Sequence, residues 1–88
     1  MIVRILGSGQ WEVAGGDLRE IEELDGVLTG AVDGGDASAF DAALENLISA
    51  VERVGTPVPE QDTPVSDLVI PGRGYTLEEV SNMLQEEV

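Results

Sequence analysis

The sequence predicts an α+β fold in the order β-β-α-α-β-α, formed as a single domain over residues 1–88. Three features indicate this class. A β-branched run opens the chain, two amphipathic helical patterns follow with a tight Asp-Gly-Gly-Asp turn between them, and a short apolar run precedes a capped helix near the end. The prolines and glycines lie mostly between these patterns, where connections are expected.

Residues 2–6 (I-V-R-I-L) form the first predicted strand, because the run is short and rich in β-branched side chains. Gly7-Ser8-Gly9 then predicts a turn, and residues 10–13 alternate polar and apolar side chains as a second strand does. An isolated hairpin is only marginally stable in water. We therefore expect Trp11 and Val13 to face inward, against the helices that follow.

The first helix is predicted to begin at Asp17, with Glu20 completing a variant of the capping box. Arg19 is expected to pair with Glu22 or Glu23 on its outer face. The helical period is carried by Leu18, Ile21, Leu24, Leu28 and Val32.

The second helix is predicted to begin at Asp36, after the turn over residues 33–36, and to end near Gly55, which is followed by Pro57. Together the two helices form an αα-hairpin. The apolar stripe of the second helix is Phe40, Ala43, Leu44, Leu47, Ile48, Val51 and Val54.

Residues 56–67 hold three of the four prolines and predict an extended connector over the surface. Residues 68–70 predict a short third strand that joins the hairpin. Thr76 and Glu79 form a capping box for the last helix. Its expected apolar face is Leu77, Val80, Met83 and Leu84.

The charge and the missing residue types exclude several classes of protein. The chain has 18 acidic residues, four arginines, no lysine, no histidine and no cysteine, with a formal net charge of -14. Disulfides, zinc sites of Cys and His, and His-based catalytic triads are excluded. Nucleic-acid binding is not expected, because it needs clustered basic residues, and no apolar run is long enough to insert into a membrane. We expect a cytoplasmic protein.

Abundant carboxylates without lysine are also typical of proteins that stay soluble in concentrated salt, which screens their repulsion. Acidic drift in an arginine-preferring genome is the alternative explanation. The charge is uneven, since residues 1–16 contain one Arg and one Glu and thus carry no net charge.

No motif in the chain predicts catalysis, a cofactor or a metal. Asp33-Gly34-Gly35-Asp36 lacks the ligand series of a calcium loop and is interpreted as a turn with a helix cap. Trp11, Arg73 and Tyr75 are the candidates for partner binding. For Trp11 and Tyr75 the competing interpretation is a place in the core, and for Arg73 it is a local salt bridge.

The ordered set of motifs resembles the phage-shock-protein-A-associated family, PspAA. The similarity begins with M-I-V-R-I-L-G-x-G-Q-W-E-V over residues 1–13 and continues with Ile21, Leu24, Asp25 and Leu28. It extends through G-T-P-V-P at 55–59, S-D-L-V-I-P at 66–71 and T-L-E-E-V at 76–80. The chain departs from the family pattern at Ser8, where an acidic residue is common, and in ending at Val88 without a Gly-Leu-Ile-Pro-like tail.

The resemblance implies a non-enzymatic accessory protein of a PspA-type envelope-stress (phage-shock) response, with a PspA-like coiled-coil protein as its partner. A second hypothesis is a self-associating module, because a small αα-hairpin domain can leave apolar surface that a homodimer covers. A third, an acidic mimic of nucleic acid, is less favoured because the carboxylates are distributed over several helices.

Overall fold

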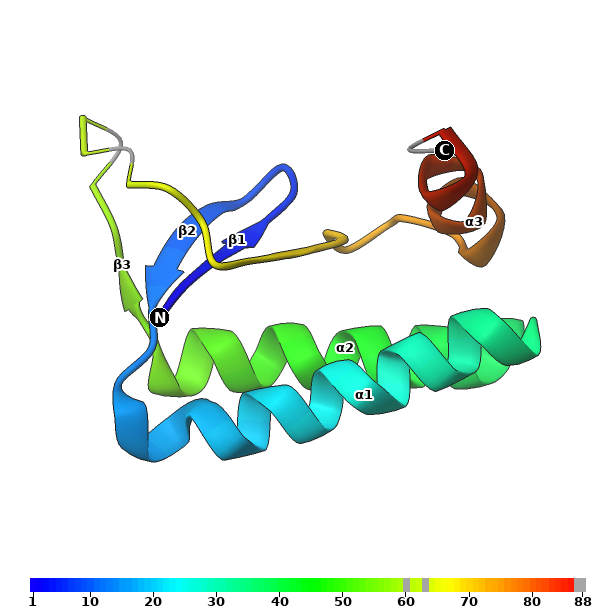
Figure 1. Ribbon diagram of the computed structural model, residues 1–88, viewed down its shortest axis with the longest axis horizontal. Coiled ribbons are helices and arrows are strands. Elements are labelled where there is room, and N and C mark those ends of the chain that lie inside the picture. The colour runs from blue at the N-terminus through cyan, green and yellow to red at the C-terminus, as the bar shows by residue number, and fades with distance from the viewer. Residues whose placement is uncertain (60, 63, 87–88) are drawn as a thin grey trace.

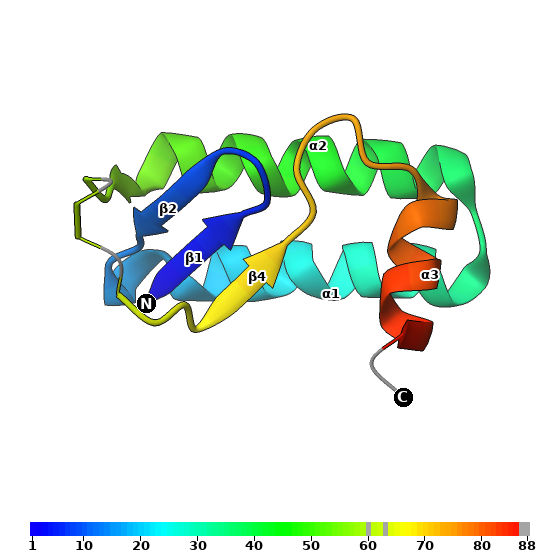
Figure 2. The same cartoon turned by 90° about the horizontal axis from the view of Figure 1, so that it is seen from above.

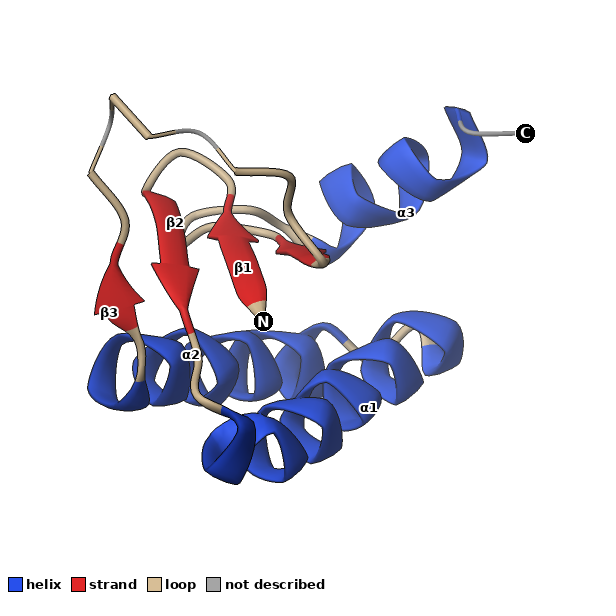
Figure 3. Cartoon of the chain, turned by 60° about the vertical axis from the view of Figure 1, so that its left-hand side comes forward, coloured by secondary structure: helices blue, strands red, loops and turns tan. Residues whose placement is uncertain are grey.

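A four-stranded sheet lies over a pair of helices in the computed structural model, which describes residues 1–59, 61–62 and 64–86, with side chains up to Asn82 (Figure 1). The strands are β1 (Ile2–Ile5), β2 (Gly9–Glu12), β3 (Thr56–Pro57) and β4 (Leu68–Ile70). Their order in the sheet is β3-β2-β1-β4. Figure 3 shows that both long helices cover the same face of this sheet.

The sheet is held in register around β1. Val3 lies opposite Trp11 of the antiparallel β2 and opposite Leu68 of the parallel β4. Since paired residues point to the same face, all three side chains are directed toward the helices. The predicted hairpin and the predicted strand at 68–70 are both confirmed.

The connector adds a strand that the sequence did not predict. Thr56 and Pro57 pair with Glu12 and Trp11 at the edge of the sheet. Proline is tolerated there because an edge strand does not need every N–H for pairing. The prediction of three strands was therefore short by one within the described part of the chain.

The rest of the connector is tied to the outer face of the sheet. The buried Gln10 side chain donates from Nε2 to the Pro64 carbonyl at 2.7 Å and to Ser66 Oγ at 2.9 Å. Asp67 Oδ2 accepts from the Ile2 N–H at 2.8 Å. These bonds anchor the segment just before β4.

The two long helices are α1 (Leu18–Gly34) and α2 (Ala37–Val54), and a 3₁₀ turn, η1 (Gly15–Asp17), precedes α1. Gly35 adopts φ 65° between them, a left-handed conformation that favours glycine. Asp36 accepts from the Ala39 N–H at 3.1 Å, so the predicted cap of the second helix is confirmed.

The predicted capping box at the start of α1 is wrong. Asp17 takes the helical conformation as the last residue of η1, so its side chain makes no cap hydrogen bond. Glu20 pairs instead with Arg53 of α2. The predicted pairing of Arg19 is confirmed with Glu23, at 3.3 Å.

Gly55 ends α2 as predicted, but its backbone is extended, with φ −85°. Only glycine fits at this position, because there is no room for a Cβ atom. A Cβ atom would lie 2.6 Å from the Val51 carbonyl oxygen and 3.0 Å from Cβ of Trp11. This close approach packs β2 onto the end of α2.

The core lies between the sheet and the two helices. α2 contributes more of it than any other element, because its apolar stripe is wide. The largest fully buried side chains are Val3, Ile5, Val13, Ile21, Phe40, Leu47, Ile48, Val51 and Ile70.

The last helix, α3 (Leu77–Glu86), crosses the helix pair beyond the end of the sheet (Figure 2). The N-cap half of its predicted capping box is confirmed, since Thr76 Oγ1 accepts from the Glu79 N–H at 3.1 Å. The Glu79 carboxylate accepts from the Thr76 hydroxyl at 3.2 Å. Val80 is buried, and the predicted side chains Met83 and Leu84 lie outside the described ones. Among the described residues, no helix has the length and apolar character needed to span a membrane.

Candidate partner-binding site

Trp11 is half-buried at the edge of the core. Its side chain lies on the inner face of β2 and contacts the backbone turn at Gly55, at the C-terminal end of α2. The prediction that Trp11 faces inward is therefore confirmed, and part of the indole remains accessible to solvent.

Arg73 forms a double ion pair with α2. Its Nε lies 3.0 Å from Glu45 Oε2, and its Nη2 lies 2.8 Å from Glu52 Oε1. The two glutamates are seven residues apart, so they lie on one face of the helix two turns from each other. This is the local salt bridge considered as the alternative for Arg73, and it leaves about half of the guanidinium side chain accessible, at 49%.

The ion pair shifts the titration of both partners. Hydrogen bonds from Arg73, and to a smaller extent from Ser49, hold the pKa of the Glu45 carboxyl below its usual value. Hydrogen bonds to Glu52 and Glu45 raise the pKa of Arg73, which stays charged at every physiological pH.

Replacing Arg73 by glutamine is expected to return the pKa of Glu45 upward toward its ordinary value. A carboxyl whose pKa is lowered by folding adds stability above its unfolded pKa and loses it as the pH falls through the folded pKa. The acid limb of the stability curve should therefore flatten in Arg73→Gln. An NMR titration of the Glu45 side-chain carboxyl measures the shift, with Arg19→Gln as the control. An unchanged Glu45 titration in Arg73→Gln would contradict the assignment.

Tyr75 is half-buried beside Arg73. The two side chains line a shallow hollow over the first half of α2, together with Asp41, Leu44 and Glu45. Trp11 contacts the opposite end of the same helix. The structure thus brings Arg73 and Tyr75 together and keeps Trp11 apart from them.

A second, more apolar hollow lies between α1, the free edge of β4 and the start of α3. We call it the α1–β4 groove, and its volume is about 270 Å³. Most of its lining is apolar, with carboxylates from α1 at its wall. The lining residues are Leu6, Asp25, Leu28, Thr29, Val32, Asp33, Val69, Ile70, Pro71 and Val80.

Sequence reasoning missed the α1–β4 groove, although one signal pointed to it. Asp25 lies directly after Leu24 in the apolar stripe of the first helix, a position where a carboxylate is unusual. In the structure, partial burial raises the pKa of Asp25 above its usual value. Within the described part of the chain, no group of three or more Asp, Glu, His or Cys residues is arranged to hold a metal ion.

Salt is expected to stabilise this fold, since most of its 18 carboxylates repel one another across the surface. The urea midpoint should rise between dilute buffer and molar KCl, where the screening length shrinks to about 3 Å. Unfolding curves recorded over a KCl series test this, with choline chloride as a second salt of equal ionic strength. A midpoint that stays flat or falls would contradict a salt-adapted surface.

Comparisons with known proteins gave one match. A family model described as PspA-associated protein matches residues 1–88, the whole chain. Searches against curated proteins and against solved structures each found no match. The family match agrees with the ordered motifs from the first strand to the last helix.

Proposed function

We propose, on the premise that this chain belongs to the PspA-associated protein family, that it is a non-enzymatic adaptor that binds a PspA-like coiled-coil protein. The observation that carries the proposal is the family match over the full length of the chain. The site of action under this proposal is the cytoplasm, in an envelope-stress response built around the partner.

The surface of the domain supports binding to a basic partner. The net charge is -14, and only four basic residues are present, three of which pair with carboxylates of the same chain. Such a charge accelerates encounter with a basic surface and suppresses contact with anionic lipid. Docking on a basic stretch of the partner would weaken the attraction of that stretch to the membrane.

The test is a direct binding measurement between the full chain and a purified PspA-like coiled-coil protein. Calorimetry at low and at high salt should both show a complex, with the association faster and tighter at low salt. Absence of binding in both conditions would refute the adaptor role. A charge-matched acidic protein serves as the control for nonspecific attraction.

One observation favours a second candidate, self-association. β4 is an edge strand with its outer side open, and Val69 on it is 52% exposed, close to Val65 in the sequence, which is 90% exposed. A symmetric dimer could cover these two exposed valine side chains. Sedimentation decides, since a strict monomer at about 100 μM excludes a stable dimer.

A further inference from the structure

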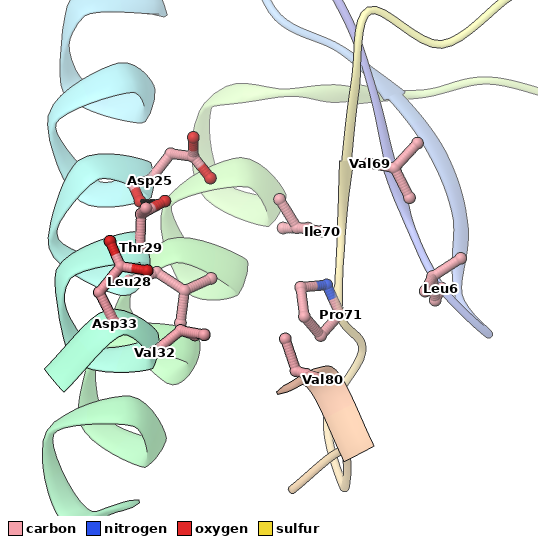
Figure 4. Close-up of a pocket in the computed structure, with 10 residues that line it drawn as sticks. All are labelled: Leu6, Asp25, Leu28, Thr29, Val32, Asp33, Val69, Ile70, Pro71 and Val80. Carbon is pink, nitrogen blue, oxygen red and sulfur yellow. Dashed lines mark hydrogen bonds between the residues drawn. The ribbon is translucent and has the colours of Figure 1, made fainter. Parts of the chain in front are cut away.

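The α1–β4 groove has two chemically different sides (Figure 4). One side is a face of α1, with Asp25, Thr29 and Asp33 placed along it. On the other side Ile70 and Pro71 point toward this face, and Val80 closes the end. An apolar hollow is thus bordered by carboxylates on a single helix.

We propose that the α1–β4 groove is the partner-binding site, which receives apolar side chains of a partner helix whose Lys or Arg residues lie over Asp25 and Asp33. The inference rests on the proposed function for the identity of the partner protein. The chemistry of the occupant, an apolar and basic helix face, follows from the groove itself.

The groove is large enough to hold one or two side chains of a partner but too small to hold a whole helix or strand. A closed cavity of about 150 Å³ is enough to hold benzene. The volume of about 270 Å³ therefore accommodates one large aromatic or two aliphatic side chains. The partner helix must lie across the mouth and insert only these side chains.

The carboxylates set the spacing of the basic residues. Asp25 and Asp33 are eight residues apart on α1, which corresponds to about 12 Å along a helix axis. A partner helix laid along α1 matches them with Lys or Arg residues seven or eight positions apart. Among the described residues, no ion pair of this chain involves either carboxylate.

The electrostatics of Asp25 favour an external cation. Partial burial raises the pKa of its carboxyl, because the charged form is less well solvated there than on an exposed aspartate. A Lys or Arg beside it would lower that pKa and stabilise the complex. The carboxylate of Asp25 is thus partly desolvated in the free protein, and a basic side chain of the partner would stabilise it in the complex.

The edge of β4 favours a helix over an added strand as the occupant. β4 has only three residues, and Pro71 follows it directly without an N–H to donate. Strand addition draws its affinity from main-chain hydrogen bonds, and this edge offers few. A helix uses the apolar hollow instead.

A matched pair of tryptophan substitutions on α1 tests the site. Thr29 lines the groove and is exposed, while Val27 is 60% exposed and lies outside the lining. Thr29→Trp fills the groove and should weaken binding of the PspA-like partner by about tenfold or more, whereas Val27→Trp should stay within about twofold. Both are measured by calorimetry on the full chain.

A second pair tests the charges. Asp25→Asn with Asp33→Asn should weaken binding by about tenfold and reduce its salt dependence. Glu12→Gln with Asp62→Asn removes the same charge from exposed positions outside the groove and should have a much smaller effect. Asp25→Asn alone should raise the unfolding midpoint at neutral pH, because the desolvated charge is gone.

The outcomes separate the two levels of the proposal. If the wild-type chain does not bind the PspA-like protein, the proposed function fails. If it binds and Thr29→Trp binds equally well, the adaptor role stands and the groove is overturned as its site. A Thr29→Trp variant that changes only self-association would also overturn it, and would place a second copy in the groove.

Discussion

Phe40→Ala is expected to lower the free energy of unfolding by about 3–5 kcal/mol, the usual cost of removing a buried aromatic ring. Phe40 is fully buried, at 0% exposure, near the start of α2 and belongs to the hydrophobic core. The total free energy of unfolding of a folded domain is only about 5–15 kcal/mol, so this loss is a large fraction of it. Urea unfolding followed by the fluorescence of Trp11, the single tryptophan, measures the change.

Val27→Ala is the control for Phe40→Ala. Val27 is 60% exposed on α1, and its truncation should change the free energy of unfolding by no more than about 0.5 kcal/mol. A loss below about 1 kcal/mol in Phe40→Ala would mean that the ring does not fill the core as the structure places it.

The helices were predictable because their signals are local. The three- and four-residue spacing of apolar side chains in α2 fixes both its length and the face it buries, and the caps at Asp36 and Thr76 need only neighbouring N–H groups. Asp17 failed as a cap because the preceding glycines continue into a 3₁₀ turn. Whether these residues form a 3₁₀ turn depends on how the chain passes from β2 to α1, and this is set by the tertiary structure.

The strand β3 was not predictable for a similar reason. Thr56 and Pro57 have no pattern of their own, and they pair only because Gly55 brings the chain back beside Trp11. The role of Gly55 was inferred from its position after a helix, although the actual requirement is the approach of Trp11. Contacts between residues 44 positions apart leave no periodic trace in a sequence.

In the candidate site, too, the features set by neighbouring residues could be predicted and those set by tertiary contacts could not. Arg73 and Tyr75 are close in sequence and meet in one hollow, so their association could be foreseen. The α1–β4 groove combines Asp25 with Val69 and Val80, which come from three separate elements. Its one local sign was a carboxylate at the border of an apolar stripe, a position that costs stability and so indicates another purpose.

Gly72→Ala is expected to destabilise the fold by about 1–3 kcal/mol, because an added Cβ has no room. It would overlap the carbonyl oxygen of Leu6, a backbone atom that cannot turn aside. Relief requires the loop after β4 to move away from the end of β1. Chemical unfolding of the variant measures the loss, and a stability equal to that of the wild type would show that the two segments are not packed in this way.

Gly26→Ala is the matched control, since nothing lies within 4 Å of its Cβ position in the interior of α1. It should stabilise the domain by up to about 1 kcal/mol, through the better helix propensity of alanine. The two substitutions add the same methyl group with opposite expected signs. Gly72 also lies between Pro71, which lines the α1–β4 groove, and Arg73, which is bound to α2. A Gly72→Ala variant that still folds should therefore lose affinity for the partner, because the shift that accommodates the methyl group displaces the wall of the groove.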